Sequence, residues 1–181
     1  IPLRLVGSEM CIRDRYISYL LTPATVCLAV PLYEQLELLK KNMVAVVCGI
    51  LSGTLASLCG IFALCTLFGF NHQQYVTMLP KSITTAIGIG ISEELGGIVT
   101  ITVAVIIITG ILGNVIADTV FHIFKIKNPL AKGLALGTAS HAIGTARAIE
   151  MGPVEGAMSS LAVAVAGLLT VVFVSGFAQL I

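Results

Sequence analysis

Three long apolar runs constrain the fold of this chain more than any other feature. Met43 to Phe70 and Gly156 to Ile181 carry no charged residue, and Ile98 to Val120 carries only Asp118. Each run exceeds the ~20 residues that an α-helix needs to cross ~30 Å of hydrocarbon. Backbone groups inside a bilayer must be hydrogen bonded within the protein, which leaves helices or closed β-barrels. Because apolar and polar residues do not alternate in these runs, as they would in barrel strands, we expect helices. We therefore predict an all-α integral membrane protein with a polytopic helical bundle.

The composition supports this class and excludes others. The chain is 57% hydrophobic and 10% charged, whereas a soluble domain is about 45–50% apolar and about 25% charged. A net charge of +1 gives no case for nucleic-acid binding. The sequence has no catalytic triad, phosphate-binding loop or metal cluster, so we expect no enzyme activity, no cofactor and no metal. Besides lipid, a partner helix or a second copy could pack on the small-residue pair Gly49 and Gly53.

The first residues differ in character from the rest. Ile1 to Arg15 crowds charged residues without a helical apolar stripe, and Leu5 to Arg15 resembles translated adapter sequence. Such segments are excluded from fold reasoning. We therefore treat 1–15 as a non-native leader and 16–181 as one membrane domain that lacks its first helices. A genuine charged leader is the alternative.

Three further segments are apolar but interrupted by proline, glycine or hydroxyl residues. They are Tyr16–Tyr33 with breaks at Pro23 and Pro31, Leu79–Gly97, and Gly133–Met151 with breaks at Gly137 and Gly144. Such breaks are tolerated in a membrane only where other protein or a water-filled cavity satisfies the freed backbone. The apolar core of Leu79–Gly97 is too short to span, which favours a re-entrant piece. We expect the three segments to converge.

The placement of lysines predicts an orientation. The connections that carry Lys40 and Lys125 should both lie in the cytoplasm. Leu79–Gly97 would then enter and leave from the outer side, and Gly133–Met151 would cross outward. An interrupted segment followed by a smooth span would occur twice in opposite orientations, which predicts an inverted repeat; in transporters, such breaks mark the binding site.

Three motifs resemble one family of membrane proteins. They are Pro23-Ala24-Thr25-Val26 through Ala29-Val30-Pro31-Leu32-Tyr33, Leu79-Pro80-Lys81-Ser82-Ile83-Thr84-Thr85, and Gly137-Thr138-Ala139-Ser140-His141-Ala142-Ile143-Gly144-Thr145-Ala146-Arg147-Ala148. Together they are similar to the LrgB family, also called CidB-like or antiholin-like proteins. The chain departs from the family at Ala86, where proline is common, and in lacking helices before the first motif.

The resemblance implies a multi-pass protein of the inner (cytoplasmic) membrane and two descriptions of its function. One is a transporter of small organic acids such as glycolate, glycerate or pyruvate. The other is an antiholin-like regulator of murein hydrolase export and autolysis, without transport of its own. Either description implies a small LrgA-type membrane protein as partner, and a homo-oligomer is also compatible.

The interrupted segments supply candidate groups for binding a carboxylate. The candidates are Lys81, Ser82, Thr84, Thr85, Thr138, Ser140, His141, Thr145 and Arg147. Arg147 could hold a carboxylate through two bonds, and Lys81 could act as a point charge. The hydroxyls could bond a 2-hydroxyl or 2-keto oxygen, and His141 could titrate near neutral pH and couple transport to protons. The alternatives are that Lys81 snorkels to an interface, that His141 is only hydrogen bonded, and that Glu150 neutralises Arg147.

Overall fold

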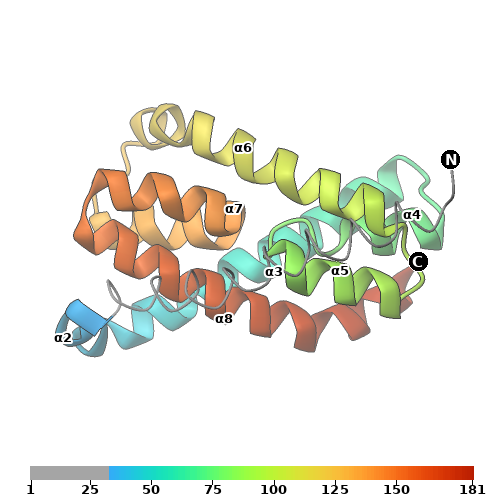
Figure 1. Ribbon diagram of the computed structural model, residues 1–181, viewed down its shortest axis with the longest axis horizontal. Coiled ribbons are helices and arrows are strands. Elements are labelled where there is room, and N and C mark those ends of the chain that lie inside the picture. Colours follow the sequence, from blue (N-terminus) through green and yellow to red (C-terminus); the bar gives the residue numbers. More distant parts are fainter. Residues whose placement is uncertain (1–32) are drawn as a thin grey trace, which may run out of the picture.

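The computed structural model describes residues 33–181, and these residues form helices without any strand (Figure 1). The described part confirms the predicted class, an all-helical fold suited to a membrane. The leader Ile1–Arg15 and the breaks at Pro23 and Pro31 lie outside the described residues.

Three helices of 25 residues form the frame. They are α3 (Met43–Leu67), α6 (Val99–Ile123) and α8 (Pro153–Phe177), with the short α2 (Leu36–Lys41) before α3 and the 3-10 turn η1 (Ala178–Leu180) after α8. All three are long and apolar enough to cross a membrane. Figure 1 shows α3 and α8 running in one direction and α6 in the other. The core agrees, because Ile50 of α3 packs with Ala162 of α8, and Leu58 packs with Val174 further along both helices.

Between α3 and α6 the chain forms a helical hairpin. Its arms are α4 (His72–Met78) and α5 (Thr85–Glu94), joined by a non-helical connection that contains Lys81. Pro80 in this connection lies against Gly88 of α5. Thr102 of α6 joins the two arms, because it donates to the carbonyl oxygen of Thr77 and shares a hydrogen bond with the hydroxyl of Ser92. The chain therefore turns back on itself, as expected for a re-entrant piece, but the first arm, α4, lies before the predicted segment Leu79–Gly97.

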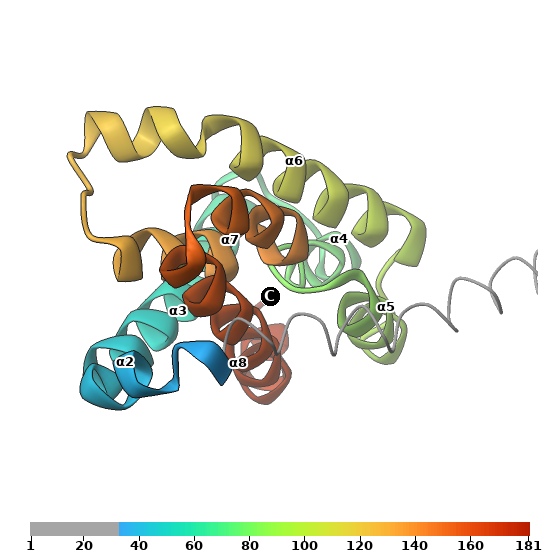
Figure 2. The same cartoon turned by 60° about the vertical axis from the view of Figure 1, so that its left-hand side comes forward.

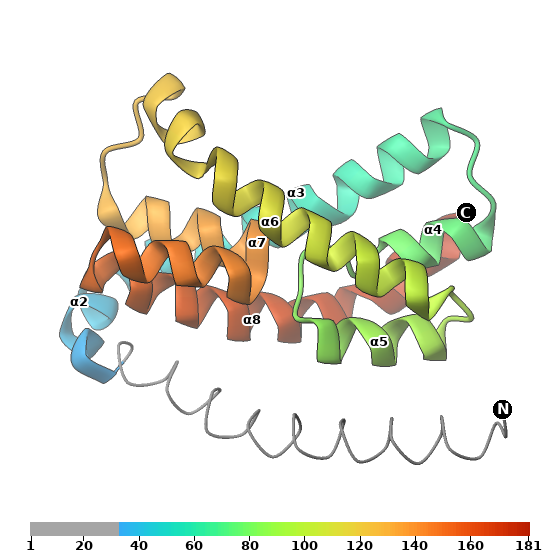
Figure 3. The ribbon, with the colours of Figure 1, turned by 45° about the horizontal axis from the view of Figure 1, so that its top comes forward.

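The helix named α7 (Pro129–Met151) is a second hairpin. Its backbone is non-helical at His141, where φ is 41° and ψ is −140°. Gly137 of the first arm packs on Ser159 of α8, and Thr145 of the second arm bonds to the same Ser159. Two residues that are equally distant from His141 thus meet the same point of α8, which requires the arms to be antiparallel. Figure 3 shows the orange ribbon of α7 turning back in this way.

Small residues make this reversal possible. A Cβ on Gly144 would lie 2.6 Å from Cβ of Ser140 and 2.8 Å from the carbonyl oxygen of Leu136. The His141 ring lies against α6, where a Cβ on Gly110 would come within 2.8 Å of its Nε2. A non-glycine residue at positive φ is uncommon and persists where its surroundings fix it. Here Nε2 of His141 donates to the carbonyl oxygen of Ile106 at 2.9 Å.

The described residues thus contain an inverted repeat with different boundaries from those predicted. Each unit is a hairpin followed by a 25-residue helix: α4 and α5 with α6, then α7 with α8. The two hairpins enter from opposite ends of the molecule and bring their tips toward its middle (Figure 3). The prediction that Gly133–Met151 crosses to the far side was wrong, because the break at His141 returns the chain to the end from which it came.

Candidate functional site

A groove between α3 and the first arm of α7 is the main open space near the hairpin tips. It has a volume of about 800 Å³. Gly49 and Gly53 on α3 contact Leu134 and Thr138 on α7, so the glycine pair brings the two helices together within the chain. Figure 2 shows the first arm of α7 beside α3 and the returning arm beneath α6. The groove reaches Lys81 at the tip of the other hairpin.

Lys81 is the cation of this groove. Its side chain is half-buried, and Nζ donates to Oγ of Ser82 at 3.0 Å and to Oγ of Ser57 at 3.5 Å. The two serine hydroxyls are 2.9 Å apart. An ammonium group has three donors, so one remains for a ligand. Within residues 33–181 no carboxylate lies within ion-pair distance of Lys81.

A small cavity adjoins the groove. Its volume is about 10 Å³, and Ser57, Ser82 and Thr138 line both spaces. Thr138 donates to the carbonyl oxygen of Leu134 at 2.8 Å. Thr54 and Thr170 complete the hydroxyl lining. Thr54 and Ser57 were not predicted from the sequence; their three-residue spacing on one face of a span was the available signal.

Several predicted site residues lie elsewhere. Thr84 and Thr85 begin α5, are half-buried, and line neither space. Ser140 and His141 form the turn of α7 and are packed against α6. Thr145 is fully buried and is hydrogen bonded to Ser159 at 2.8 Å. The structure therefore brings together Lys81, Ser82 and Thr138 of the predicted set and separates them from the others.

Arg147 has carboxylate partners within the chain. Its guanidinium bonds to Asp118 of α6, and to Glu150 at 2.7 Å. The hydrogen bonds to Asp118 and Glu150 raise the pKa of the Arg147 side chain, a group that is charged at physiological pH in any case. Arg147 does not line the groove. Because two carboxylates already balance its positive charge, we do not place a substrate carboxylate there.

The arrangement of helices and hairpins defines the class of protein. Three apolar helices and two opposed re-entrant hairpins, with a lysine between the tips, form a helical membrane protein. The model of the LrgB-like family matches residues 11–180. The chain therefore belongs to the LrgB family.

Curated relatives carry the same family name. Proteins named antiholin-like protein LrgB from Bacillus cereus (strains B4264 and AH187) and from Bacillus anthracis (strain CDC 684 / NRRL 3495) are each 42% identical over 163 residues. The matched part is 90% of this chain and 71% of each relative. No solved structure matches the chain.

Proposed function

We propose that this protein transports small organic carboxylates, such as glycolate, glycerate or pyruvate, across the inner (cytoplasmic) membrane as a multi-pass protein. The observation that carries the proposal is Lys81. A charged side chain within a membrane is costly unless it is paired, and such ionisable residues are functional candidates by default. Within residues 33–181 the ammonium of Lys81 meets only the hydroxyls of Ser57 and Ser82. An anion entering the groove would supply the missing negative charge.

The position of Lys81 supports transport as well as binding. It lies at the tip of a re-entrant hairpin, where the two inverted units meet. In transporters with inverted repeats, substrate sites lie near the bilayer midplane at the interface between repeats, and motion of one unit against the other alternates access. Lys81 and Ser82 come from the first unit and Thr138 from the second, so such motion would open the site to either side.

The test is uptake of labelled glycolate, glycerate and pyruvate into proteoliposomes. Lys81→Met keeps the length and apolar stem of the side chain and removes its charge. Loss of a hydrogen bond to a charged group costs about 1.5–3 kcal/mol, which corresponds to roughly a 10- to 100-fold weaker apparent affinity. Lys127→Met, at an exposed position outside the groove, is the control and should behave like the wild type. Unchanged uptake in a folded Lys81→Met variant would exclude this site.

The alternative function is that of an antiholin-like regulator without transport of its own. The names of the relatives favour it, and exposed small residues on α3 support it. Ser52, Ala56 and Gly60 are exposed, and nothing in the described part of the chain lies within 4 Å of a Cβ placed on Gly60. Such a face suits close packing of a partner helix, for example from an LrgA-type protein. This alternative predicts no uptake of any of the three acids by wild-type protein that binds the partner normally.

A further inference from the structure

Thr54 of α3 has a hydroxyl group without a hydrogen-bond partner in the described residues. The side chain is 3% exposed, and its Oγ1 is the one buried side-chain oxygen or nitrogen of residues 33–181 without a partner. An unpaired buried hydroxyl costs about 1–3 kcal/mol. Such a group in a native protein calls for an explanation, of which a ligand is one.

Other buried helical threonines behave differently. Thr138, Thr145 and Thr170 each donate to the carbonyl oxygen four residues earlier, at distances of 2.8, 3.0 and 2.7 Å. The same back-bond occurs at Thr77, at 2.6 Å. Thr54 makes no such bond to Ile50. Its proton is therefore available to a group outside the helix.

Thr54 lines a cavity of the right size for one oxygen atom. The cavity volume of about 10 Å³ is near the lower limit for one water molecule. Its polar lining consists of Thr54, Ser57, Ser82, Thr138 and Thr170. Because Thr138 and Thr170 give their protons to backbone carbonyls, and Ser57 and Ser82 bond to each other and to Lys81, Thr54 is the member of this lining without any hydrogen bond.

Lys81 stands at the boundary between this cavity and the groove. It donates to Ser57 and Ser82, and both serines line both spaces. We propose that Thr54 is a specificity-determining residue, which donates a hydrogen bond to the α-oxygen of a 2-oxygenated acid whose carboxylate is held by Lys81. This inference rests on the transport function proposed above and adds a second contact on the same ligand.

The chemistry of the cavity gives the selectivity. An α-hydroxyl or α-keto oxygen accepts the proton of Thr54, whereas a methyl group in the same place leaves the Thr54 hydroxyl unpaired. Sites built to hydrogen bond a substrate oxygen reject analogues that lack it for this reason. Glycolate and propionate are a suitable pair, because they differ by a hydroxyl in place of a methyl group.

The experiment measures the uptake of both acids by proteoliposomes holding wild-type protein, Thr54→Val, Thr54→Ser or the control Thr66→Val. Wild-type protein should favour glycolate, and Thr54→Val, which keeps the volume and loses the donor, should lower the ratio of glycolate to propionate uptake about tenfold. Thr54→Ser keeps the donor and should keep the ratio. Thr66 lies on the same helix, is exposed and makes its own back-bond to Phe62, so Thr66→Val should also keep the ratio.

The unfolding temperature of each variant separates binding from a structural role. Because the hydroxyl of Thr54 is unpaired, Thr54→Val should be at least as stable as the wild type. A glycolate-to-propionate ratio in Thr54→Val equal to that of the wild type would overturn the role of Thr54 and leave the transport proposal standing. If that variant is also less stable than the wild type, the hydroxyl only holds a resident water. No uptake of either acid by wild-type protein would instead overturn the transport proposal and this inference with it.

Discussion

Gly144 lies directly against Ser140 across the turn of α7, so that a Cβ on Gly144 would be 2.6 Å from the Cβ of Ser140. The residues are four apart, yet they belong to different arms of the hairpin, because the backbone leaves the helical conformation at His141. The close approach of the arms therefore depends on the missing side chain.

Gly144→Ala should destabilise the protein. The added methyl group would also lie 2.8 Å from the carbonyl oxygen of Leu136, and backbone cannot move aside as a flexible side chain can. Overpacking of this kind costs about 1–3 kcal/mol, which would appear as a lower unfolding temperature in detergent.

Gly90→Ala is the matched control for this substitution. Gly90 lies in α5, and no described atom lies within 4 Å of a Cβ placed there. Because alanine favours helix over glycine, the control should be neutral or slightly stabilising. Equal effects of the two substitutions would show that the arms of α7 are not closely packed at Gly144.

The class of fold was predictable because long apolar runs leave the backbone few choices. The runs beginning at Met43, Ile98 and Gly156 correspond to α3, α6 and α8. A re-entrant piece around Leu79–Gly97 was also predictable, since its apolar core is too short to span, although its first arm, α4, lies before that segment. These inferences rest on the length and composition of each apolar run, which can be read directly from the sequence.

The path of α7 was not predictable from the same information. Pro129–Met151 is long enough to cross, and its glycines are compatible with either a kinked span or a hairpin. The decision depends on contacts with other helices, such as that of His141 with Ile106 of α6. Residues far apart in the sequence thus decide where the chain turns.

The composition of the site was predictable only in part. Lys81, Ser82 and Thr138 belong to motifs with recognisable residue types, and they line the groove. Thr54 is a hydroxyl inside an apolar helix, and most such residues bond to their own helix. Its unpaired state depends on the neighbouring helices, which sequence patterns do not describe.

Arg147→Lys should lower the unfolding temperature without changing the uptake of glycolate per folded protein. The guanidinium bonds to Asp118 and Glu150 at the same time, and lysine cannot reproduce a two-sided arrangement of planar donors. Because both acidic side chains are largely exposed, added salt should reduce the difference between the variant and the wild type.

Glu150→Gln tests the same cluster from its acidic side. It should act in the same direction as Arg147→Lys and also leave uptake unchanged. A stable Arg147→Lys variant with strongly reduced uptake would return Arg147 to the binding site and contradict its assignment as a structural ion pair.

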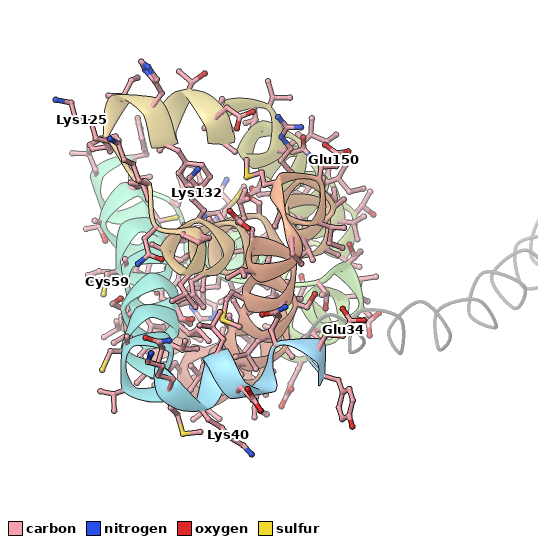
Figure 4. The ribbon with its side chains drawn as sticks, turned by 90° about the vertical axis from the view of Figure 1, so that its left-hand side faces the viewer. Glu34, Lys40, Cys59, Lys125, Lys132 and Glu150 are labelled. Carbon is pink, nitrogen blue, oxygen red and sulfur yellow. The ribbon has the colours of Figure 1, made fainter. Side chains whose placement is uncertain are left out.

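The hairpin of α7 makes a specific prediction about membrane topology. Figure 4 views the molecule from the end at which Lys40, Lys125 and Glu150 lie. If Gly133–Met151 crossed the membrane, Glu150 would lie on the side opposite to Lys125. In the structure the chain returns at His141, so Glu150 and both lysine-bearing connections share one side, which the excess of lysine assigns to the cytoplasm.

Labelling of single cysteines with a membrane-impermeant maleimide in a cysteine-free background measures this arrangement. Lys41→Cys, Lys127→Cys and Glu150→Cys are exposed positions that should react in inverted vesicles and not in intact cells. Gln73→Cys, at the open end of the other hairpin, should react in intact cells and serves as the control for outside access. Reaction of Glu150→Cys from the same side as Gln73→Cys would mean that α7 crosses the membrane, and the inverted repeat described here would not hold.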